Sequence, residues 1–398
     1  MILRPDALVL PGGRVESGLE VCIADGRIER IRPWSGATRE ETDLLLSLAF
    51  VNAHSHLEYY DLMGQLDGLS YWDWIQSITE MKPKRTIETV QLAAILAARR
   101  NVRTGVAAVG EISDWPVSGR AMKRSGLSGR VFQEVITLKE YETPGQKLAL
   151  ARERARKNAD ESGLPVHLSA HAAYSVTAQT LRDISRTGEP NSIHVSESVI
   201  ENQFFLRGEG PIAEMYDRAG LPFEPPGCTC AAYLDSLGAL HKKTQIVHAC
   251  DLTPEDISIA AERGVTAAHC PRSNRALGCP PAPVAELRRR GVKVGLGMDS
   301  AASSGPIDTF AEMRAALKAA QERGDPLTPQ DVWTMATEEA AESIWLPREW
   351  RIAEGAGPDL ILIDHSGARD LQTLIEHGGP ARIHRMIRLT ASLPKTES

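Results

Sequence analysis

Two histidines, His54 and His56, have the spacing in this chain that most clearly predicts chemistry. They lie just after an apolar run over residues 44–51. Such a run is typical of a buried strand. Side chains two residues apart point to the same face of a strand, so both imidazoles would project from one strand end. Imidazole is a common ligand of zinc and iron, although a surface histidine pair also arises by chance. The pair predicts a metal site if later strand ends supply further ligands.

Strand-like runs alternate with helical segments from about residue 46 onward, and this alternation decides where further ligands could lie. Such alternation predicts a parallel sheet with right-handed crossovers. Eight units within about 250 residues favour a closed (β/α)8 TIM-type barrel over an open sheet. The expected strands are, in chain order, 46–53, 106–112, 131–137, 166–171, 192–196, 245–249, 265–269 and 293–298.

The sequence at both ends of the chain predicts a small β domain beside the barrel. Short strand signals fill residues 7–31, with a hairpin expected at Asp25-Gly26. Strand signals return at 359–364 and 383–389. We therefore expect an α/β chain with two domains, and their expected extents are a (β/α)8 barrel over residues 46–349 and a small β-sandwich domain built from residues 1–45 together with 350–398.

Composition limits the class of protein. The chain has 398 residues, of which 42% are hydrophobic and 24% charged, and these are ordinary globular values. The formal net charge is −7 without a dense basic tract, which disfavours nucleic-acid binding. The sequence has no run of about 18 apolar residues that would predict a membrane span. Its N-terminus lacks the regions of a signal peptide, so we expect a cytoplasmic protein without a membrane partner.

Polar residues at the expected strand ends supply candidates for a site, because the carboxyl ends of barrel strands converge on one place. Seven of the eleven histidines lie in or at these strands, more than random placement would give. In chain order, the candidate residues are His54 and His56, then His171, His194 with Glu197 three residues later, His248 and Asp299.

We expect His54, His56, His194 and Asp299 to bind one divalent metal ion. Imidazoles with a carboxylate suit zinc best, and iron is the alternative. An open position would hold water, whose pKa falls from 15.7 to about 7 at such an ion. A second ion would need a bridging group, usually a modified lysine at the end of strand four, and residues 165–174 contain no lysine.

Glu197, His248 and Asp299 are the expected catalytic residues for hydrolysis at an amine-bearing carbon. A glutamate in a partly dry pocket can have its pKa raised toward neutrality, so Glu197 could protonate a ring nitrogen. Asp299 would accept the proton of the attacking water, and His248 would hold hydroxide by a hydrogen bond. The alternative role for Glu197 is that of a helix N-terminal carboxylate that complements the helix dipole.

Five segments resemble the amidohydrolase superfamily over almost the whole chain: 51–57 (VNAHSHL), 171–175 (HAAYS), 194–198 (HVSES), 247–250 (VHAC) and 295–300 (GLGMDS). They are most similar to its mononuclear deaminase branch, which includes adenosine-type, S-adenosylhomocysteine and guanine deaminases. The resemblance implies the metal-ligand and acid/base roles given above.

Two further segments, 270–275 (CPRSNR) and 310–314 (FAEMR), resemble the aminodeoxyfutalosine deaminases within this branch. This resemblance implies a 6-amino-6-deoxyfutalosine deaminase of menaquinone biosynthesis. The alternatives are a deaminase of S-adenosylhomocysteine, methylthioadenosine or adenosine, or an amidohydrolase acting on another heterocyclic amine or on an amide. A catalytically silent binding protein is the remaining alternative.

The expected substrate contacts are His171, Trp74, Arg272 and Arg275, which would bind a small aminopurine nucleoside. His171 ends strand four outside the ligand set. Trp74 is expected in a loop after strand one, where it could stack on the purine or pack as a lid residue. Arg272 or Arg275 could pair with a substrate carboxylate, or be a solvated surface group. A homodimer is the assembly expected from its frequency among soluble oligomers.

Overall fold

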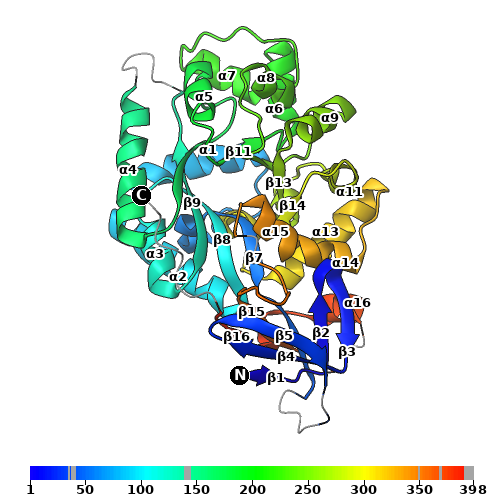
Figure 1. The fold of residues 1–398 in the computed structure, drawn as a ribbon. Helices are drawn as coiled ribbons and strands as arrows, with labels where there is room; N and C mark the ends of the chain where they lie inside the picture. Colours follow the sequence, from blue (N-terminus) through cyan, green and yellow to red (C-terminus); the bar gives the residue numbers. More distant parts are fainter. Residues whose placement is uncertain (35, 37–41, 139–144, 348–349, 367–369, 390–398) are drawn as a thin grey trace.

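The computed structural model describes residues 1–34, 36, 42–138, 145–347, 350–366 and 370–389 (Figure 1). Within these residues the chain has an α/β fold. Its central strands form two parallel four-stranded sheets, ordered β7-β8-β9-β10 and β11-β12-β13-β14. These strands are β7 (Phe50–Ser55), β8 (Val106–Ser113), β9 (Ser128–Val135), β10 (Val166–Ala170), β11 (Asn191–Val195), β12 (Thr244–His248), β13 (Thr266–His269) and β14 (Val294–Leu296).

Parallel bridges join the two sheets at both edges. Ala172, just beyond β10, pairs with His194 in β11, and Ser55 in β7 pairs with Asp299, which follows β14. The backbone N–H of Asp299 also donates to the carbonyl of His54 at 3.0 Å. The eight strands therefore close into a ring, and the α/β fold predicted from the alternation is confirmed.

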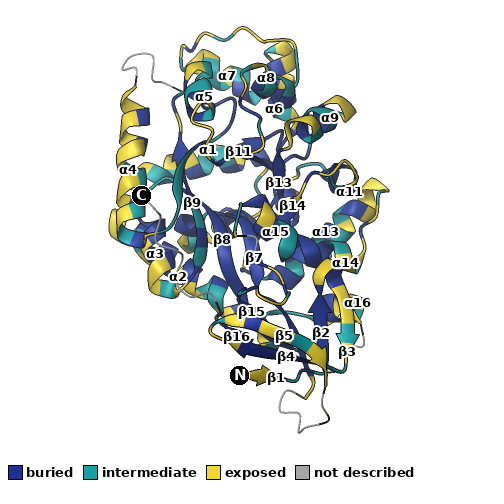
Figure 2. Cartoon of the chain, viewed as in Figure 1, coloured by how far each residue is buried: buried dark blue, intermediate teal, exposed yellow. Residues whose placement is uncertain are grey.

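Helices cover the outside of the ring, with their buried faces toward the strands and exposed faces outward (Figure 2). In α2, for example, Val90, Ala94 and Ala97 recur at helical spacing and are buried. The helices are α1 (Tyr71–Met81), α2 (Ile87–Arg103), α3 (Ser118–Ser125), α4 (Gln146–Ser162), α5 (Ala178–Ser185), α6 (Val199–Arg207), α7 (Pro211–Arg218), α8 (Cys230–Ser236), α9 (Pro254–Arg263), α10 (Pro271–Ala276), α11 (Val284–Arg289), α12 (Ala301–Ser304), α13 (Thr309–Arg323), α14 (Pro329–Met335), α15 (Glu338–Ser343) and α16 (Leu371–His377).

Strands from both ends of the chain lie side by side (Figure 1). A five-stranded sheet has the order β16-β15-β6-β2-β3, and a three-stranded sheet has the order β1-β4-β5. The hairpin expected at Asp25-Gly26 joins β4 to β5, and both turn residues have positive φ. The strands are β1 (Ile2–Leu3), β2 (Ala7–Leu10), β3 (Arg14–Ser17), β4 (Leu19–Ala24), β5 (Arg27–Pro33), β6 (Leu44–Leu48), β15 (Leu360–Asp364) and β16 (Ile383–Ile387).

The strand predicted over 46–53 is wrong in its extent, because two strands meet there. Residues of β6 pair with β15 and β2, and the first barrel strand begins only at Phe50. Both strands are buried, and the apolar run over residues 44–51 continues across the break, so hydrophobicity could not locate the break at Ala49. Residues 390–398, assigned to the β part from sequence, lie outside the described residues. None of the described helices is long and apolar enough to cross a membrane.

Candidate active site

A cavity of about 210 Å³ lies at the carboxyl ends of the barrel strands. Seven of the residues predicted from strand ends line it or are buried beside those that do. His56, His171, His194, Glu197, His248 and Asp299 line the cavity. His54 is fully buried beside them, and its ring lies 4.9 Å from the ring of His56. The tertiary structure therefore brings the predicted metal and acid/base residues into one place.

Three of these residues, His54, His56 and Asp299, have ligand atoms close enough to share one metal ion, and a ligand atom of His194 lies close to those of His54 and His248. His54 Nε2 and His56 Nε2 lie 3.6 and 3.5 Å from the same oxygen of Asp299, Oδ1. The ring of His194 lies 5.1 Å from that of His54. Both ring nitrogens of His54 are buried without a hydrogen-bond partner, an arrangement that is costly unless another group binds them. These residues fit a divalent metal ion, whose charge and vacant coordination positions would satisfy the nitrogens.

Hydrogen bonds orient the ligand atoms toward one point. His194 Nδ1 donates to the carbonyl oxygen of His171 at 2.8 Å, so the lone pair of Nε2 faces the site. The other carboxylate oxygen of Asp299, Oδ2, accepts from Ser273 Oγ at 2.5 Å and from Ser303 Oγ at 3.1 Å. Oδ1 is therefore left to face the histidines.

The backbone turns sharply where the strands end. Asn52 supports this region because its Oδ1 accepts from the N–H of Met298 at 2.9 Å. Left-handed φ values cost non-glycine residues about 1–3 kcal/mol each and cluster at functional sites. The residues with such values are Ser196 (48°), His248 (67°), Ala249 (51°) and Asp299 (52°).

Glu197 faces His248 across the cavity. Glu197 Oε2 lies 3.5 Å from His248 Nε2. His248 Nδ1 donates to Asn274 Oδ1 at 2.8 Å, because an amide oxygen can only accept. His248 Nε2 is therefore the atom that faces the cavity with its lone pair.

Burial sets the protonation of these groups. It raises the pKa of Glu197 well above its usual value, and the charges of Asp299 and Glu201 raise it further. Burial also lowers the pKa of His248 to about 4. For Asp299 burial acts to raise the pKa, but the close imidazoles of His54, His248 and His56 hold the pKa well below its usual value. At neutral pH His248 is thus neutral and Asp299 is ionised, and burial favours the protonated form of Glu197.

Glu201, and not Glu197, acts as the helix N-terminal carboxylate. Glu201 lies in the first turn of α6, and its carboxylate accepts from the N–H of Ser196 at 3.2 Å and of Glu197 at 2.8 Å. The side chain of Glu197 lines the cavity instead. This arrangement favours the acid/base role for Glu197 over the alternative.

Trp74 and His171, two of the expected substrate contacts, both line the cavity. Trp74 lies in the first turn of helix α1, which begins at Tyr71 and is capped by Ser70, and not in the expected loop. Its Nε1 donates to the carbonyl of Ala302 at 3.3 Å. The indole is therefore hydrogen-bonded to the backbone of α12, and the residue lines the cavity.

Arg272 and Arg275 are not brought to the cavity, contrary to expectation. Arg272 Nη1 donates to the carbonyl of Pro306 at 2.7 Å and lies 3.4 Å from Glu312 Oε1. Arg275 pairs with Glu322 at 3.1 Å on the surface. Carboxylates of this chain pair with both guanidinium groups. We therefore leave Arg272 and Arg275 out of the proposed substrate site.

The sequence interpretation missed an apolar wall and a second polar cluster. Ile75 and Ile78 of α1 line the cavity with Trp74, and their spacing of i, i+1 and i+4 is a helical signal that could have identified them. Lys82 and Glu134 also line it. Glu134 lies at the end of a barrel strand, but it has no metal-ligand pattern that would single it out.

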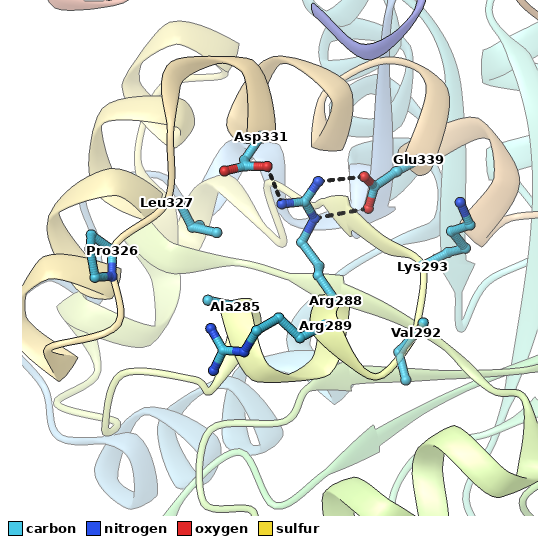
Figure 3. Close-up of a pocket in the computed structure, with 10 residues that line it drawn as sticks. Ala285, Arg288, Arg289, Val292, Lys293, Pro326, Leu327, Asp331 and Glu339 are labelled. Carbon is cyan, nitrogen blue, oxygen red and sulfur yellow. Dashed lines mark hydrogen bonds and ion pairs between the residues drawn. The ribbon is translucent and has the colours of Figure 1, made fainter.

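A second cavity, of about 350 Å³, lies at the opposite end of β14 (Figure 3). Val292 and Lys293, which line it, directly precede that strand. Figure 3 shows the guanidinium of Arg288 between Asp331 and Glu339, with hydrogen bonds to both. Its charges are thus paired within the chain, and none of the predicted site residues lies there.

Comparison with known proteins places the chain in a family. A model described as the amidohydrolase family matches residues 45–387. A 5-methylthioadenosine/S-adenosylhomocysteine deaminase of Nitratidesulfovibrio vulgaris is 30% identical over 371 residues, which cover 88% of this chain and 79% of the relative. An aminodeoxyfutalosine deaminase of Deinococcus radiodurans is 31% identical over 324 residues, covering 76% and 75%.

A solved structure shows the same fold. The crystal structure of an adenosine deaminase from Xanthomonas campestris with bound zinc superposes with a TM-score of 0.82 and 24% identity, covering 98% of this chain and 91% of that one. The match of the family model extends over most of the chain, and the buried histidine and aspartate group lies at the barrel strand ends. This protein therefore belongs to the amidohydrolase family and is a hydrolase that acts on carbon–nitrogen bonds.

Proposed function

We propose that this protein is a metal-dependent aminohydrolase that replaces the C6 amino group of an adenine nucleoside with oxygen and releases ammonia. The observation that carries this proposal is the buried carboxyl of Glu197, which faces His248 at 3.5 Å beside the His54, His56 and Asp299 group. The names of the relatives support the same class of substrate, because both are deaminases of adenine nucleosides.

One divalent ion, with zinc as the first choice and iron as the alternative, would be held by His54, His56, His194 and Asp299. When bound, it would lower the pKa of a water molecule and so supply a nucleophile near neutral pH. Two nitrogen atoms of His54 without partners and a shared carboxylate oxygen are the features that support this ligand set.

The side chains around the ion divide the proton transfers between them. Glu197 donates its proton to N1 of the purine as the water oxygen adds at C6, which makes C6 tetrahedral. Asp299 accepts one proton of the attacking water and passes it to the amino group, which leaves as ammonia, while the proton of the C6 hydroxyl returns to Glu197 as the C6 carbonyl forms. His248 Nε2 accepts a hydrogen bond from the attacking water, because its Nδ1 proton is held by Asn274. Trp74 packs against the base.

For the specific substrate, we propose 6-amino-6-deoxyfutalosine, and with it a place in menaquinone biosynthesis. The sequence resemblance and the relative from Deinococcus radiodurans support this choice. The homodimer and the cytoplasmic location stay predictions.

One observation favours a second candidate, a nucleoside with a neutral 5′ group such as methylthioadenosine. Among the described residues, Lys82 is the one Lys or Arg that lines the cavity, and it already lies 3.6 Å from Glu134. A substrate carboxylate would therefore find no cation without a partner there. The apolar side chains of Ile136, Leu138 and Met215 would suit a methylthio group instead.

A panel assay with zinc-loaded protein tests the proposal. Ammonia release and loss of adenine absorbance would be followed with 6-amino-6-deoxyfutalosine, methylthioadenosine, S-adenosylhomocysteine and adenosine, and a simple amide would serve as the substrate of the rival hydrolase. We expect deamination of at least one nucleoside and the highest kcat/KM for 6-amino-6-deoxyfutalosine. A higher value for methylthioadenosine would reverse the choice of substrate, and no deamination with cleavage of the amide would overturn the proposal.

A further inference from the structure

Lys82, Glu134 and His171 form a second polar cluster in the same cavity, and the proposed chemistry does not use it. Lys82 Nζ lies 3.6 Å from Glu134 Oε2, and His171 Nε2 lies 4.0 Å from Glu134 Oε1. The side chain of Glu134 is only 4% exposed. A carboxylate this buried needs a binding role or a structural one, because its desolvation is costly.

The surroundings of Lys82 balance its charge. Its ammonium group also lies 3.6 Å from Asp114 Oδ2 and 5.6 Å from the centre of the Tyr59 ring. Asp114 is in turn bound by Arg154 at 2.9 Å. Two carboxylates thus face two cations, and the part that lines the cavity, Lys82 with Glu134, is a neutral pair.

A neutral pair of this kind discriminates between ligand classes. A carboxylate or phosphate of the substrate would have to compete with Glu134 for Lys82, which disfavours an anion. A second metal ion is disfavoured as well, because the ammonium group already compensates Glu134. A hydroxyl both donates and accepts, so two adjacent hydroxyls can donate to the carboxylate and accept from the ammonium. Carboxylates bind ribose hydroxyls in this way in dinucleotide-binding proteins.

The cluster also lies on a suitable side of the reacting centre. His171 separates it from the metal group, with its ring 4.9 Å from that of His194 and its Nε2 toward Glu134. A nucleoside whose C6 edge faces Glu197 and Asp299 must direct its sugar away from them, within the same cavity.

Building on the function proposed above, we propose that Lys82 and Glu134 form a sugar subsite that binds the vicinal 2′ and 3′ hydroxyls of a ribonucleoside. The subsite makes the ribose, and not only the base, a determinant of specificity. It adds two substrate-binding residues that have no part in the proton transfers.

The first test compares nucleosides on the unaltered, zinc-loaded protein. Adenosine and 2′,3′-dideoxyadenosine differ only in the two hydroxyls. We expect kcat/KM to fall at least about tenfold for the dideoxy compound, because the polar pair would then lose its partners. Calorimetric titration should show the same preference for inosine over 2′,3′-dideoxyinosine, which measures binding without turnover.

The second test asks whether Glu134 causes the preference. Glu134→Gln keeps the size of the side chain and removes its charge, so the adenosine-to-dideoxyadenosine ratio of kcat/KM should approach one. Glu80→Gln makes the same change at an exposed position of α1 that does not line the cavity, and its ratio should equal that of the unaltered protein. If Glu134→Gln fails to fold, Lys82→Gln must reduce the ratio for the proposal to hold.

The outcomes separate the two proposals. Deamination of both nucleosides at equal kcat/KM would overturn the sugar subsite and leave the deaminase proposal intact. A preference for adenosine that persists in both Glu134→Gln and Lys82→Gln would overturn the assignment to these residues. Deamination of no adenine nucleoside, together with equal binding of the two inosine compounds, would overturn both proposals.

Discussion

The two cavities at opposite ends of the barrel differ in how their polar groups are satisfied. At the carboxyl ends of the strands, buried His54 has two ring nitrogens without partners, and burial raises the pKa of Glu197. In the cavity of Figure 3, Arg288 is hydrogen-bonded to Asp331 and Glu339. Burial acts to raise the pKa of Asp331, but hydrogen bonds from Thr328 and Arg288 hold that pKa below its usual value.

This difference separates a site from a structural ion-pair network, even though the second cavity is larger. Polar groups that are buried, strained and without partners are costly in the folded chain, so they indicate a ligand. The ion pairs of the second cavity can stabilise the fold without any ligand. Whether the buried polar groups have hydrogen-bond partners therefore identifies the functional site better than cavity volume does.

The largest expected effect follows from removing a metal ligand. His54→Ala should lower kcat/KM at least about 10³-fold, because the ion lowers the pKa of bound water from 15.7 to about 7. Mass spectrometry should show the metal content falling from about one ion per chain. The Arg288→Met variant, changed in the other cavity, should keep the metal of the active site. Its kcat/KM should stay within about twofold of that of the unaltered protein. Full activity of His54→Ala without metal would contradict the assignment of the site.

The next effect concerns proton transfer. Glu197→Gln should lower kcat by at least about 10²-fold with little change in metal content, since the amide cannot donate a carboxyl proton. The free energy of unfolding should change little, because glutamine resembles a protonated glutamate in size and charge. Steady-state kinetics and urea unfolding measure the two quantities. An unchanged kcat would refute the acid/base role.

A buried carboxyl at the same end of the barrel should link stability to pH. Burial raises the pKa of Glu201 to about 7 from 4.5. Between these values the folded chain keeps the proton and the unfolded chain releases it, so the free energy of unfolding falls as pH rises. The fall is 1.36 kcal/mol per pH unit, or about 3 kcal/mol in all.

Urea unfolding from pH 5 to 8 measures this linkage. Glu201→Gln should remove its part of the slope, whereas Glu214→Gln, at an exposed position of α7, is the matched control. Equal slopes in the unaltered protein and in Glu201→Gln would show that Glu201 does not titrate in this window.

The smallest effect belongs to the second cavity. Arg288→Met should lower the free energy of unfolding by about 1–2 kcal/mol, because two carboxylates lose a partly exposed partner. Arg289→Met, at the more exposed neighbour, should change it less. A loss of catalysis in Arg288→Met larger than its loss of stability would mean that the two cavities do not differ in the way proposed.

Much of the candidate site could be predicted because its residues lie at strand ends. The alternation of strands and helices indicated that the carboxyl ends of the strands would meet at one site. The polar residues at those ends were then His54, His56, His171, His194 and Asp299. The same reasoning failed where patterns were locally identical. Strands β6 and β7 are both buried and one apolar run crosses from the first into the second, so only their pairing partners show that they belong to different sheets.

By itself, the sequence determined the fold class, the order of the strands and the types of ligand that their ends carry, because these depend on local spacing. The tertiary structure decided which charged groups reach the cavity. Arg272 follows a barrel strand yet is held by Glu312, whereas Lys82, distant in sequence from Glu134, lies beside it. The physical reason is that the partner of a long charged side chain is set by neighbours in space, which local spacing does not specify.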